Sequence, residues 1–281
     1  MEEGEEGYRK LNKQRQLSLL SDILKIKILE NNGRELDFIL EDSNPQFANA
    51  LRRIMIAEIP ILAIEYVDFT QNESVLYNEI VSQRLGMVPL VFNVKDFKFR
   101  EAGKEGGVQY EVIFAINKKG PGMVYTKDMK SSNPQVTPLY DDIPIVELFE
   151  EQKIKLEAVA SLGIGRDHAK YQAANVFYRY YPIVKLEGKI KNAEEAMKIC
   201  PKNALKIDGS KASVTKDCDM CLECVKVAEP SGSLNVSGDT TKFIFSVESI
   251  SGLDADAIVI RAAEVLKKKS KELQKELKKL K

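Results

Sequence analysis

The sequence has few of the residues on which several classes of protein depend. Among its 281 residues there is no tryptophan, one histidine (His168) and only four cysteines. Three of the cysteines lie within seven residues, which is too close for an ordinary disulfide framework. A secreted domain stabilised by disulfides is therefore excluded, and such close cysteines in a reducing compartment indicate a bound metal.

An excess of charge of one sign is also absent. Lysine and arginine total 42, aspartate and glutamate also total 42, and the formal net charge is zero. A protein whose main task is to wrap nucleic acid needs surplus positive charge to neutralise phosphates. We therefore expect that this chain does not recognise nucleic acid directly.

Long hydrophobic runs are missing as well. The most apolar stretch, residues 54–64, is short and is interrupted by Glu58 and Pro60. A membrane-spanning helix needs about 20 consecutive apolar residues. The acidic start at residues 1–6 does not resemble a secretory signal. These features predict a cytoplasmic protein with no membrane contact.

Turn and capping residues predict the first elements of the fold. Residues 19–40 alternate in polarity and contain a turn at residues 31–33 (Asn-Asn-Gly), which indicates a β-hairpin. Residues 43–45 (Ser-Asn-Pro) are a helix-start signal, and this helix must end before Pro60. Its apolar stripe is a candidate partner interface, formed by Phe47, Leu51, Ile54 and Met55.

The end of the chain predicts a longer helix that begins near Ser251. Apolar residues recur there at alternating spacings of four and three, the pattern of a coiled-coil seam. After Leu266 the residues away from the seam are mostly lysine and glutamate. Packing on its own domain and pairing with a partner helix both fit the pattern, and Leu266 and Leu273 are the candidate partner contacts. The seam comprises Val259, Ala263, Leu266, Ser270, Leu273, Leu277 and Leu280.

The cysteines follow the spacing of an iron–sulfur protein. Bacterial ferredoxins use C-x2-C-x2-C-x3-C-P twice, and the fourth cysteine of each run binds the cluster of the other run. The four ligands of one cluster are present here as Cys200, Cys218, Cys221 and Cys224. The four ligand positions of the other cluster hold Ile190, Ala193, Ala196 and Ala228. The pattern predicts one 4Fe–4S cluster in a ferredoxin-like unit.

Other uses of the four thiols remain open at this point. Residues 204–214 have the short-strand, Gly-turn, short-strand pattern of a ferredoxin core, and a bound metal can supply the folding energy that so small a unit lacks. A tetrahedral zinc site would use the same donors. A three-iron cluster and redox-active thiols are the further alternatives.

Signals of an active site are missing. Gly163 and Gly165 lack the strand–helix context and the further glycine of a dinucleotide site, and no G-x4-G-K-[ST] motif occurs. His168 has no cysteine or serine nucleophile signature near it. Asp254 and Asp256 form the only D-x-D, in the first turn of the expected last helix, where the helix dipole favours carboxylates. We expect no active site in this chain.

Three further motifs resemble those of a known family. Residues 44–60 (NPQFANALRRIMIAEIP) resemble the dimerisation helix shared by the bacterial alpha subunit of RNA polymerase and its archaeal and eukaryotic relatives. Residues 79–90 (EIVSQRLGMVPL) and 167–182 (DHAKYQAANVFYRYYP) are similar to the second and third hallmarks of that family. A ferredoxin-like insertion after the third is typical of the archaeal alpha-like members.

The resemblance implies an α+β fold with a discontinuous organisation. Residues 1–16 are expected to form a flexible tail. The dimerisation domain would comprise residues 17–62, 177–187 and 238–281. Residues 63–176 would form an inserted mainly β domain with a short helix near residues 79–85, and residues 188–237 a ferredoxin-like cluster domain.

The resemblance also implies partners and a role. The chain would pair with a smaller alpha-like subunit, L, and this pair would be the platform for further small subunits and the two large catalytic subunits. The alternative is a redox protein in which a ferredoxin module is fused to an interaction domain. An electron carrier should have a second cluster, a flavin motif or an acidic docking face. The second ligand set is absent here and lysines surround the first, at positions 198, 202, 206, 211 and 216. The scaffold is the interpretation that these residues favour.

Overall fold

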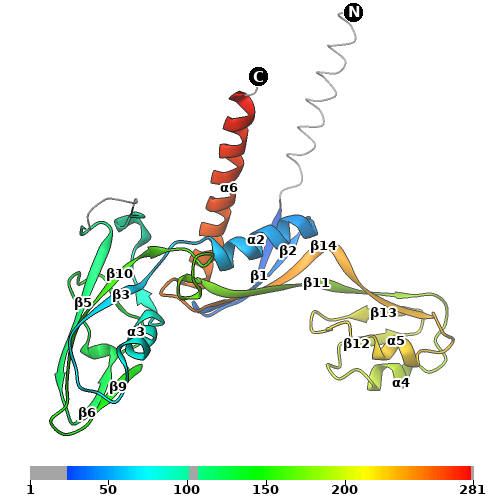
Figure 1. The fold of residues 1–281 in the computed structure, drawn as a ribbon. Coiled ribbons are helices and arrows are strands. Elements are labelled where there is room, and N and C mark those ends of the chain that lie inside the picture. Colours follow the sequence, from blue (N-terminus) through cyan, green and yellow to red (C-terminus); the bar gives the residue numbers. More distant parts are fainter. Residues whose placement is uncertain (1–23, 101–106, 280–281) are drawn as a thin grey trace, which may run out of the picture. The chain divides into compact units, whose positions relative to one another are not determined.

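The computed structural model describes residues 24–100 and 107–279. The expected tail at residues 1–16 and the last seam residue, Leu280, lie outside these ranges. The described residues form a mixture of helices and strands, so the expected α and β composition is confirmed (Figure 1). No helix within the described ranges has the length and apolar character needed to cross a membrane.

The chain packs as two compact units, each assembled from separated segments. One contains Asp37–Asn49, Tyr178–Phe245 and the described part of Met1–Leu29. The other contains the described parts of Glu30–Leu36, Ala50–Phe177 and Ser246–Lys281. The cysteines belong to the first unit, and the C-terminal helix belongs to the second. The division into three domains with the limits given above stays a prediction.

A four-stranded sheet has the order β1-β2-β14-β11. Its strands are β1 (Lys25–Asn31), β2 (Glu35–Glu41), β14 (Leu234–Ser249) and β11 (Ala174–Leu186). The turn between β1 and β2 is stabilised by Asn31, whose Oδ1 accepts the Gly33 N–H at 2.9 Å, and by a φ of 87° at Gly33. The predicted hairpin is confirmed, because the local Asn-Asn-Gly chemistry is sufficient to form it.

Helix α2 (Pro45–Ala57) begins and ends where the sequence predicts. Asn44 Oδ1 accepts the Phe47 N–H at 2.8 Å and caps the helix. The apolar stripe named above as a candidate partner interface is mostly buried in the single chain. Leu51, Ile54 and Met55 have 5%, 5% and 0% of their surface exposed, and Phe47 is half-buried. The stripe is buried because it packs into the hydrophobic core of its own chain.

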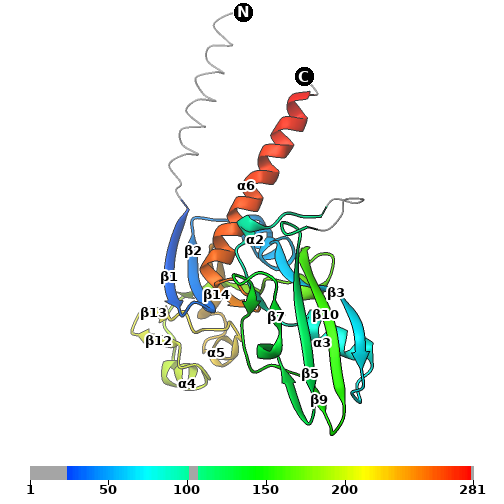
Figure 2. The same ribbon diagram turned by 90° about the vertical axis from the view of Figure 1, so that its left-hand side faces the viewer.

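A second four-stranded sheet has the order β3-β10-β5-β7 and is antiparallel where its strands pair (Figure 2). Its strands are β3 (Ile61–Asn72), β10 (Lys153–Gly163), β5 (Glu111–Lys119) and β7 (Lys130–Ser131). Two short pairs accompany it, β4 (Leu90–Val91) with β8 (Thr137–Pro138) and β6 (Gly122–Tyr125) with β9 (Pro144–Leu148). The mainly β character predicted for this segment is confirmed.

Short helices complete this part of the chain. Helix α3 (Asn78–Gly86) packs on β3 and buries Val81 and Leu85, in agreement with the predicted short helix. The 3-10 helices are η1 (Val94–Asp96), η2 (Thr126–Asp128) and η3 (Ala169–Tyr171).

The unit that carries the cysteines has small elements of its own. They are α4 (Ala193–Lys198), β12 (Leu205–Asp208), β13 (Lys211–Val214) and α5 (Glu223–Val227). Strands β12 and β13 form an antiparallel hairpin, as the strand–Gly–strand pattern predicts. A hydrophobic core beneath them consists of Leu205, Cys224, Ala228, Leu234 and Val236.

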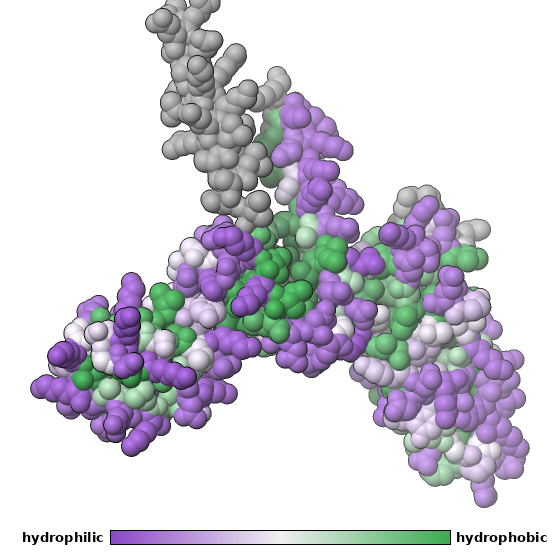
Figure 3. All heavy atoms as spheres, turned by 180° about the vertical axis from the view of Figure 1, so that it is seen from behind, coloured by the Kyte–Doolittle hydropathy of each residue, from purple (hydrophilic) through white to green (hydrophobic). Residues whose placement is uncertain are grey.

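Helix α6 (Ala255–Lys279) begins four residues later than the sequence suggests. Ser251 does not cap it, because Ser251 lies in a turn held by Arg34, whose guanidinium donates to the carbonyls of Ser249 at 2.8 Å and Ser251 at 2.7 Å. The first turns of α6 bury Ala255, Ile258 and Ala262. Residues 267–279 are all exposed, and Figure 3 shows this half as mostly hydrophilic with hydrophobic side chains along one edge.

Glu58 connects the end of α2 to α6 within the second unit. Its carboxylate forms ion pairs with Arg166, at 2.8 Å, and with Lys269 on α6. The Glu58 side chain is only 16% exposed, whereas the Arg166 and Lys269 side chains are 64% and 48% exposed. The ion pair with Lys269 ties the middle of α6 to the end of α2.

Candidate metal centre and partner-facing residues

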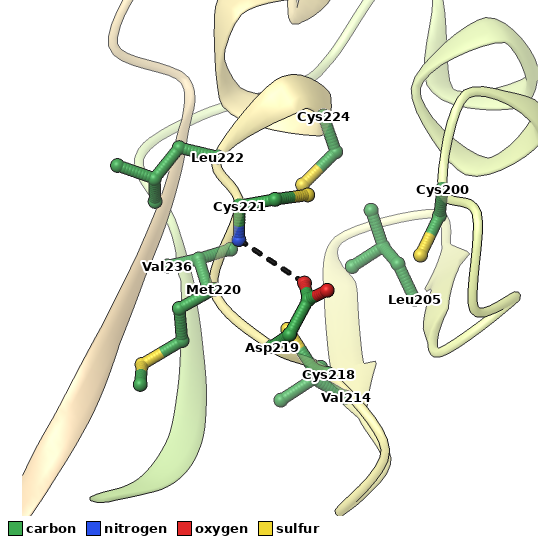
Figure 4. Close-up of a pocket in the computed structure, with 10 residues that line it drawn as sticks. All are labelled: Cys200, Leu205, Val214, Cys218, Asp219, Met220, Cys221, Leu222, Cys224 and Val236. Atoms are coloured by element: carbon green, nitrogen blue, oxygen red, sulfur yellow. Dashed lines mark hydrogen bonds between the residues drawn. The ribbon is translucent and has the colours of Figure 1, made fainter. Parts of the chain in front are cut away.

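All four cysteines line one small pocket (Figure 4). Cys221 and Cys224 point into it from one side, and Cys200 faces them from the other side. All four thiols are free. Cys224 is buried, Cys200 and Cys218 are half-buried and Cys221 is exposed. The rest of the lining is Leu205, Val214, Asp219, Met220, Leu222 and Val236.

Local structure brings the distant Cys200 to this pocket. It lies just after α4, where its N–H donates to the Met197 carbonyl at 3.3 Å. The Ala204 N–H is 3.4 Å from the Cys200 sulfur, so this backbone amide already points at the thiol. The hairpin β12–β13 follows and leads the chain back to Cys218. The β12–β13 hairpin therefore accounts for the eighteen-residue spacing between the two cysteines.

The loop from Cys218 to Cys224 has an unusual backbone. Met220 and Leu222 have φ angles of 58° and 64°, in the left-handed region that non-glycine residues rarely occupy. Such conformations concentrate at functional sites, where the surroundings hold them. Successive right- and left-handed residues turn backbone N–H groups inward to form anion-binding concavities of the kind found at iron–sulfur sites.

Two of the four thiols have a shifted pKa. Burial raises the pKa of the Cys218 and Cys224 thiols above the usual value, and charge repulsion from the other cysteines raises both further. A metal bound here would have to displace these protons, because thiolates are the ligands.

The donor set is the one that iron–sulfur clusters and structural zinc share. Within the described ranges, no group of three or more His, Cys, Asp or Glu side chains is arranged to hold a metal ion. The four sulfurs line a common pocket without converging on a single point. Four cysteines around one pocket fit a cluster by donor type and number, and the bound group itself stays a prediction.

The positions of the missing second cluster are filled by packed side chains. Ala196 and Ala228 are 0% and 3% exposed, and Ile190 packs against the hydrophobic core of the unit. Asn192 joins the two halves there, since its Nδ2 donates to the Val227 carbonyl and its Oδ1 accepts the Glu229 N–H, both at 2.9 Å. Apolar packing and hydrogen bonds thus hold the elements of the unit together at this end, as the cysteines and their cluster are predicted to do at the other end.

Exposed apolar side chains mark the surfaces available to partners. On α6, Leu273 and Leu277 are 62% and 54% exposed, and Leu266 is half-buried. On β1, Ile26 and Ile28 are 56% and 61% exposed. Sequence reasoning missed these isoleucines, although the Lys-Ile-Lys-Ile alternation predicts a strand with one apolar face.

Residues of the third motif have a structural role. Lys170 forms an ion pair with Glu65 at 2.7 Å, and the Tyr171 hydroxyl donates to the same carboxylate. Burial opposes ionisation of Glu65, but these hydrogen bonds outweigh it and hold its pKa below the usual value. Burial and the Glu65 carboxylate together raise the pKa of Tyr171. His168 caps the adjacent turn, where its Nδ1 accepts the Lys170 N–H at 3.1 Å.

The two glycines that precede this motif allow close packing. A Cβ atom on Gly163 would lie 2.4 Å from the Tyr171 ring, and one on Gly165 would lie 2.5 Å from the Ile56 carbonyl oxygen. Both distances are shorter than any ordinary contact of a Cβ atom. The glycine pair is therefore required by packing rather than by a nucleotide phosphate.

Known proteins match both the central segment and nearly the whole chain. Residues 67–178 match the RNA polymerase Rpb3/RpoA insert domain. DNA-directed RNA polymerase subunit Rpo3 of Archaeoglobus fulgidus is 36% identical over 256 residues, which are 89% of this chain and 97% of the relative. Rpo3 of Pyrococcus furiosus is 34% identical over 259 residues, which are 92% of this chain and 98% of the relative. The chain therefore belongs to the archaeal Rpo3 family, the alpha-like subunits of DNA-directed RNA polymerase.

Proposed function

We propose that this chain is a non-catalytic assembly platform of a multisubunit RNA polymerase and that it carries one iron–sulfur cluster. It pairs with the smaller alpha-like subunit, L, and the pair then binds further small subunits and the two large catalytic subunits. The observation that carries the proposal is the similarity to Rpo3 subunits along nearly the whole chain, at 36% identity over 256 residues for the Archaeoglobus fulgidus protein.

The outer half of α6 is the surface proposed for pairing with L. Its exposed leucines, Leu273 and Leu277, repeat at coiled-coil spacing and have no apolar neighbour in their own unit that buries them. Leu51, Ile54 and Met55 of α2 stabilise the chain itself, so their contribution to pairing is indirect. Phe47, which is half-buried, is the residue of that stripe that remains available for contact.

The proposed cofactor is one 4Fe–4S cluster held by Cys200, Cys218, Cys221 and Cys224. Support comes from the shared pocket, from the left-handed backbone at Met220 and from the match to ferredoxin spacing. When bound, the cluster would supply a covalent connection between the end of α4 and the loop before α5. Such a connection contributes folding free energy to a unit whose apolar core is small.

Co-purification tests both halves of the proposal. The chain should be co-expressed with subunit L, purified without oxygen and analysed for iron, zinc and bound proteins. We expect a stable complex with L, a brown colour and about four irons per chain. A variant with Cys218→Ser and Cys221→Ser should lose iron and retain L, because the α6 seam is untouched. It should also recover less of the large subunits, since a disordered lobe loses conformational entropy on docking.

The outcomes separate the alternatives. A colourless protein with one zinc per chain would replace the cluster by a zinc site and leave the platform intact. Absence of every polymerase subunit from a native pull-down would contradict the platform and favour the redox protein. Loss of L together with iron in the double variant would show that the cluster stabilises the whole chain.

A further inference from the structure

We propose that Arg179 is a positioning residue for the cluster loop, which it holds by the Cys218 carbonyl while placing a positive charge beside Cys218. The inference rests on the cluster proposed above. Arg179 belongs to the third sequence motif and is distant in sequence from the cysteines. It is not part of the ferredoxin-like cysteine motif.

A side-chain hydrogen bond joins the strand to the loop. Arg179, on β11, donates from Nη1 to the Cys218 carbonyl oxygen at 2.9 Å, across 39 residues of sequence. The side chain is half-buried, and a hydrogen bond from a charged donor is about twice as strong as a neutral one. Cys218 is the first ligand of the C-x2-C-x2-C loop, so this contact fixes the point at which the loop begins.

The strand that carries Arg179 is itself held rigidly. Its neighbours Tyr178 and Tyr180 both pack against Phe243, with ring centroids 5.6 and 5.3 Å apart. Tyr178 also contacts Phe245, which stacks on Phe38 at 5.0 Å. An aromatic row across three strands thus supports the base of the arginine, and the guanidinium has a fixed platform from which to hold the loop.

A second contact holds the same loop one residue before the next cysteine. A Cβ atom on Gly238 would lie 2.5 Å from Tyr180 Cβ and 3.5 Å from the Met220 sulfur. The glycine therefore lets the Tyr180 side chain and the Met220 thioether approach strand β14 together. Met220 has the left-handed backbone described above, and this packing helps to maintain it. The loop is held at Cys218 by Arg179 and at Met220 by packing.

Charge gives Arg179 a second effect that a neutral donor would lack. A guanidinium stays protonated at any physiological pH. Four thiolates and the cluster they bind form a negatively charged group, and a nearby cation favours its more negative, reduced state. Asp219, next to Cys218, carries a negative charge that disfavours the reduced state. Its carboxylate accepts a hydrogen bond from the Cys221 N–H at 3.2 Å. Removing Arg179 should therefore make reduction harder and make the loop less well held.

The test compares three variants of the full chain in its complex with L, prepared without oxygen. Arg179→Gln removes the charge, and Arg179→Lys keeps a charge and one donor. Lys185→Gln is the matched control, because it removes the same charge from an exposed position on the same strand. The measurements are iron per chain, the rate of iron release to a chelator and the reduction potential followed by the loss of visible absorbance.

We expect Arg179→Gln to release iron several-fold faster and to have a more negative potential, with Arg179→Lys close to the unaltered protein and Lys185→Gln unchanged. An unchanged potential in Arg179→Gln overturns the proposal even if iron is lost faster, because loss of a structural contact explains that alone. If Arg179→Gln holds no cluster, the test depends on Arg179→Lys. Failure of Arg179→Lys to hold iron would also overturn the proposal. Absence of iron from the unaltered complex would contradict both the proposed cluster and the role of Arg179. Iron in the unaltered complex with no effect of either Arg179 variant would contradict only the role of Arg179.

Discussion

Replacement of Leu273 by aspartate should strongly weaken pairing with L and leave the fold of the chain intact. Leu273 lies on the outer half of α6 and is 62% exposed in the single chain. The substitution therefore separates binding from folding, which no change at Leu51 or Ile54 can do, since both are 5% exposed and belong to the core.

The magnitude follows from the exposed surface. Full burial of a leucine side chain stabilises by about 1.5–3 kcal/mol, so burying the exposed 62% of Leu273 against a partner contributes about 1–2 kcal/mol. An aspartate at the same contact adds the cost of an unpaired charge, which is at least about 2 kcal/mol. A loss of about 3–5 kcal/mol weakens binding at least about a hundredfold, at 1.4 kcal/mol for each factor of ten.

Titration calorimetry with purified L measures the effect, and urea unfolding of the free chain checks the fold. Lys275→Asp is the control, because Lys275 lies on the opposite side of α6 from Leu273. The substitution introduces the same residue close to the same helix end. We expect Lys275→Asp to bind L with nearly unaltered affinity. Equal weakening by both substitutions, or normal binding by Leu273→Asp, would refute the assignment of the seam to pairing.

Two further predictions concern the contacts around the third motif. The folded-state pKa of Glu65 lies below its usual 4.5, so Glu65 stabilises the fold above about pH 4.5 and this contribution is lost as the pH falls through the lower folded value. Glu65→Gln should lower the urea midpoint at neutral pH and flatten its dependence between about pH 5 and pH 3, and parallel profiles would contradict this. Gly163→Ala should destabilise by about 1–3 kcal/mol, because its Cβ atom would lie 2.4 Å from the buried Tyr171 ring. Gly107→Ala is the matched control, since its Cβ atom would meet no described residue closer than 3.9 Å, and equal midpoints for the two variants would rule out the clash.

Elements with a local cause could be predicted from the sequence. Helix α2 starts at Pro45 because Asn44 caps it, and the hairpin before it turns at Gly33 because glycine accepts a φ of 87°. The pairing of β12 with β13 follows from a turn at Gly209 between two short strands. Each of these depends on residues within a few positions of one another, so no tertiary information is needed.

The start of α6 shows where local reasoning fails. Ser251 has the side chain of a cap, but Arg34 binds the carbonyls around it and holds residues 249–253 as a turn. Arg34 is more than 200 residues away in sequence, and its effect cannot be read from the neighbours of Ser251. The helix therefore begins at Ala255.

The sequence by itself determined the family, the four cysteines of the candidate metal centre and the amphipathic character of both long helices, because motif spacing and periodicity are properties of the chain. Only the tertiary structure decided which apolar face remains exposed. The stripes of α2 and α6 look alike in sequence, yet Met55 is fully buried and Leu273 is 62% exposed. Burial depends on which segments pack over a helix, and the spacing of apolar residues within the helix carries no information about those segments. The contact of Arg179 with Cys218 has the same origin, because a strand and a loop 39 residues apart meet only in the folded chain.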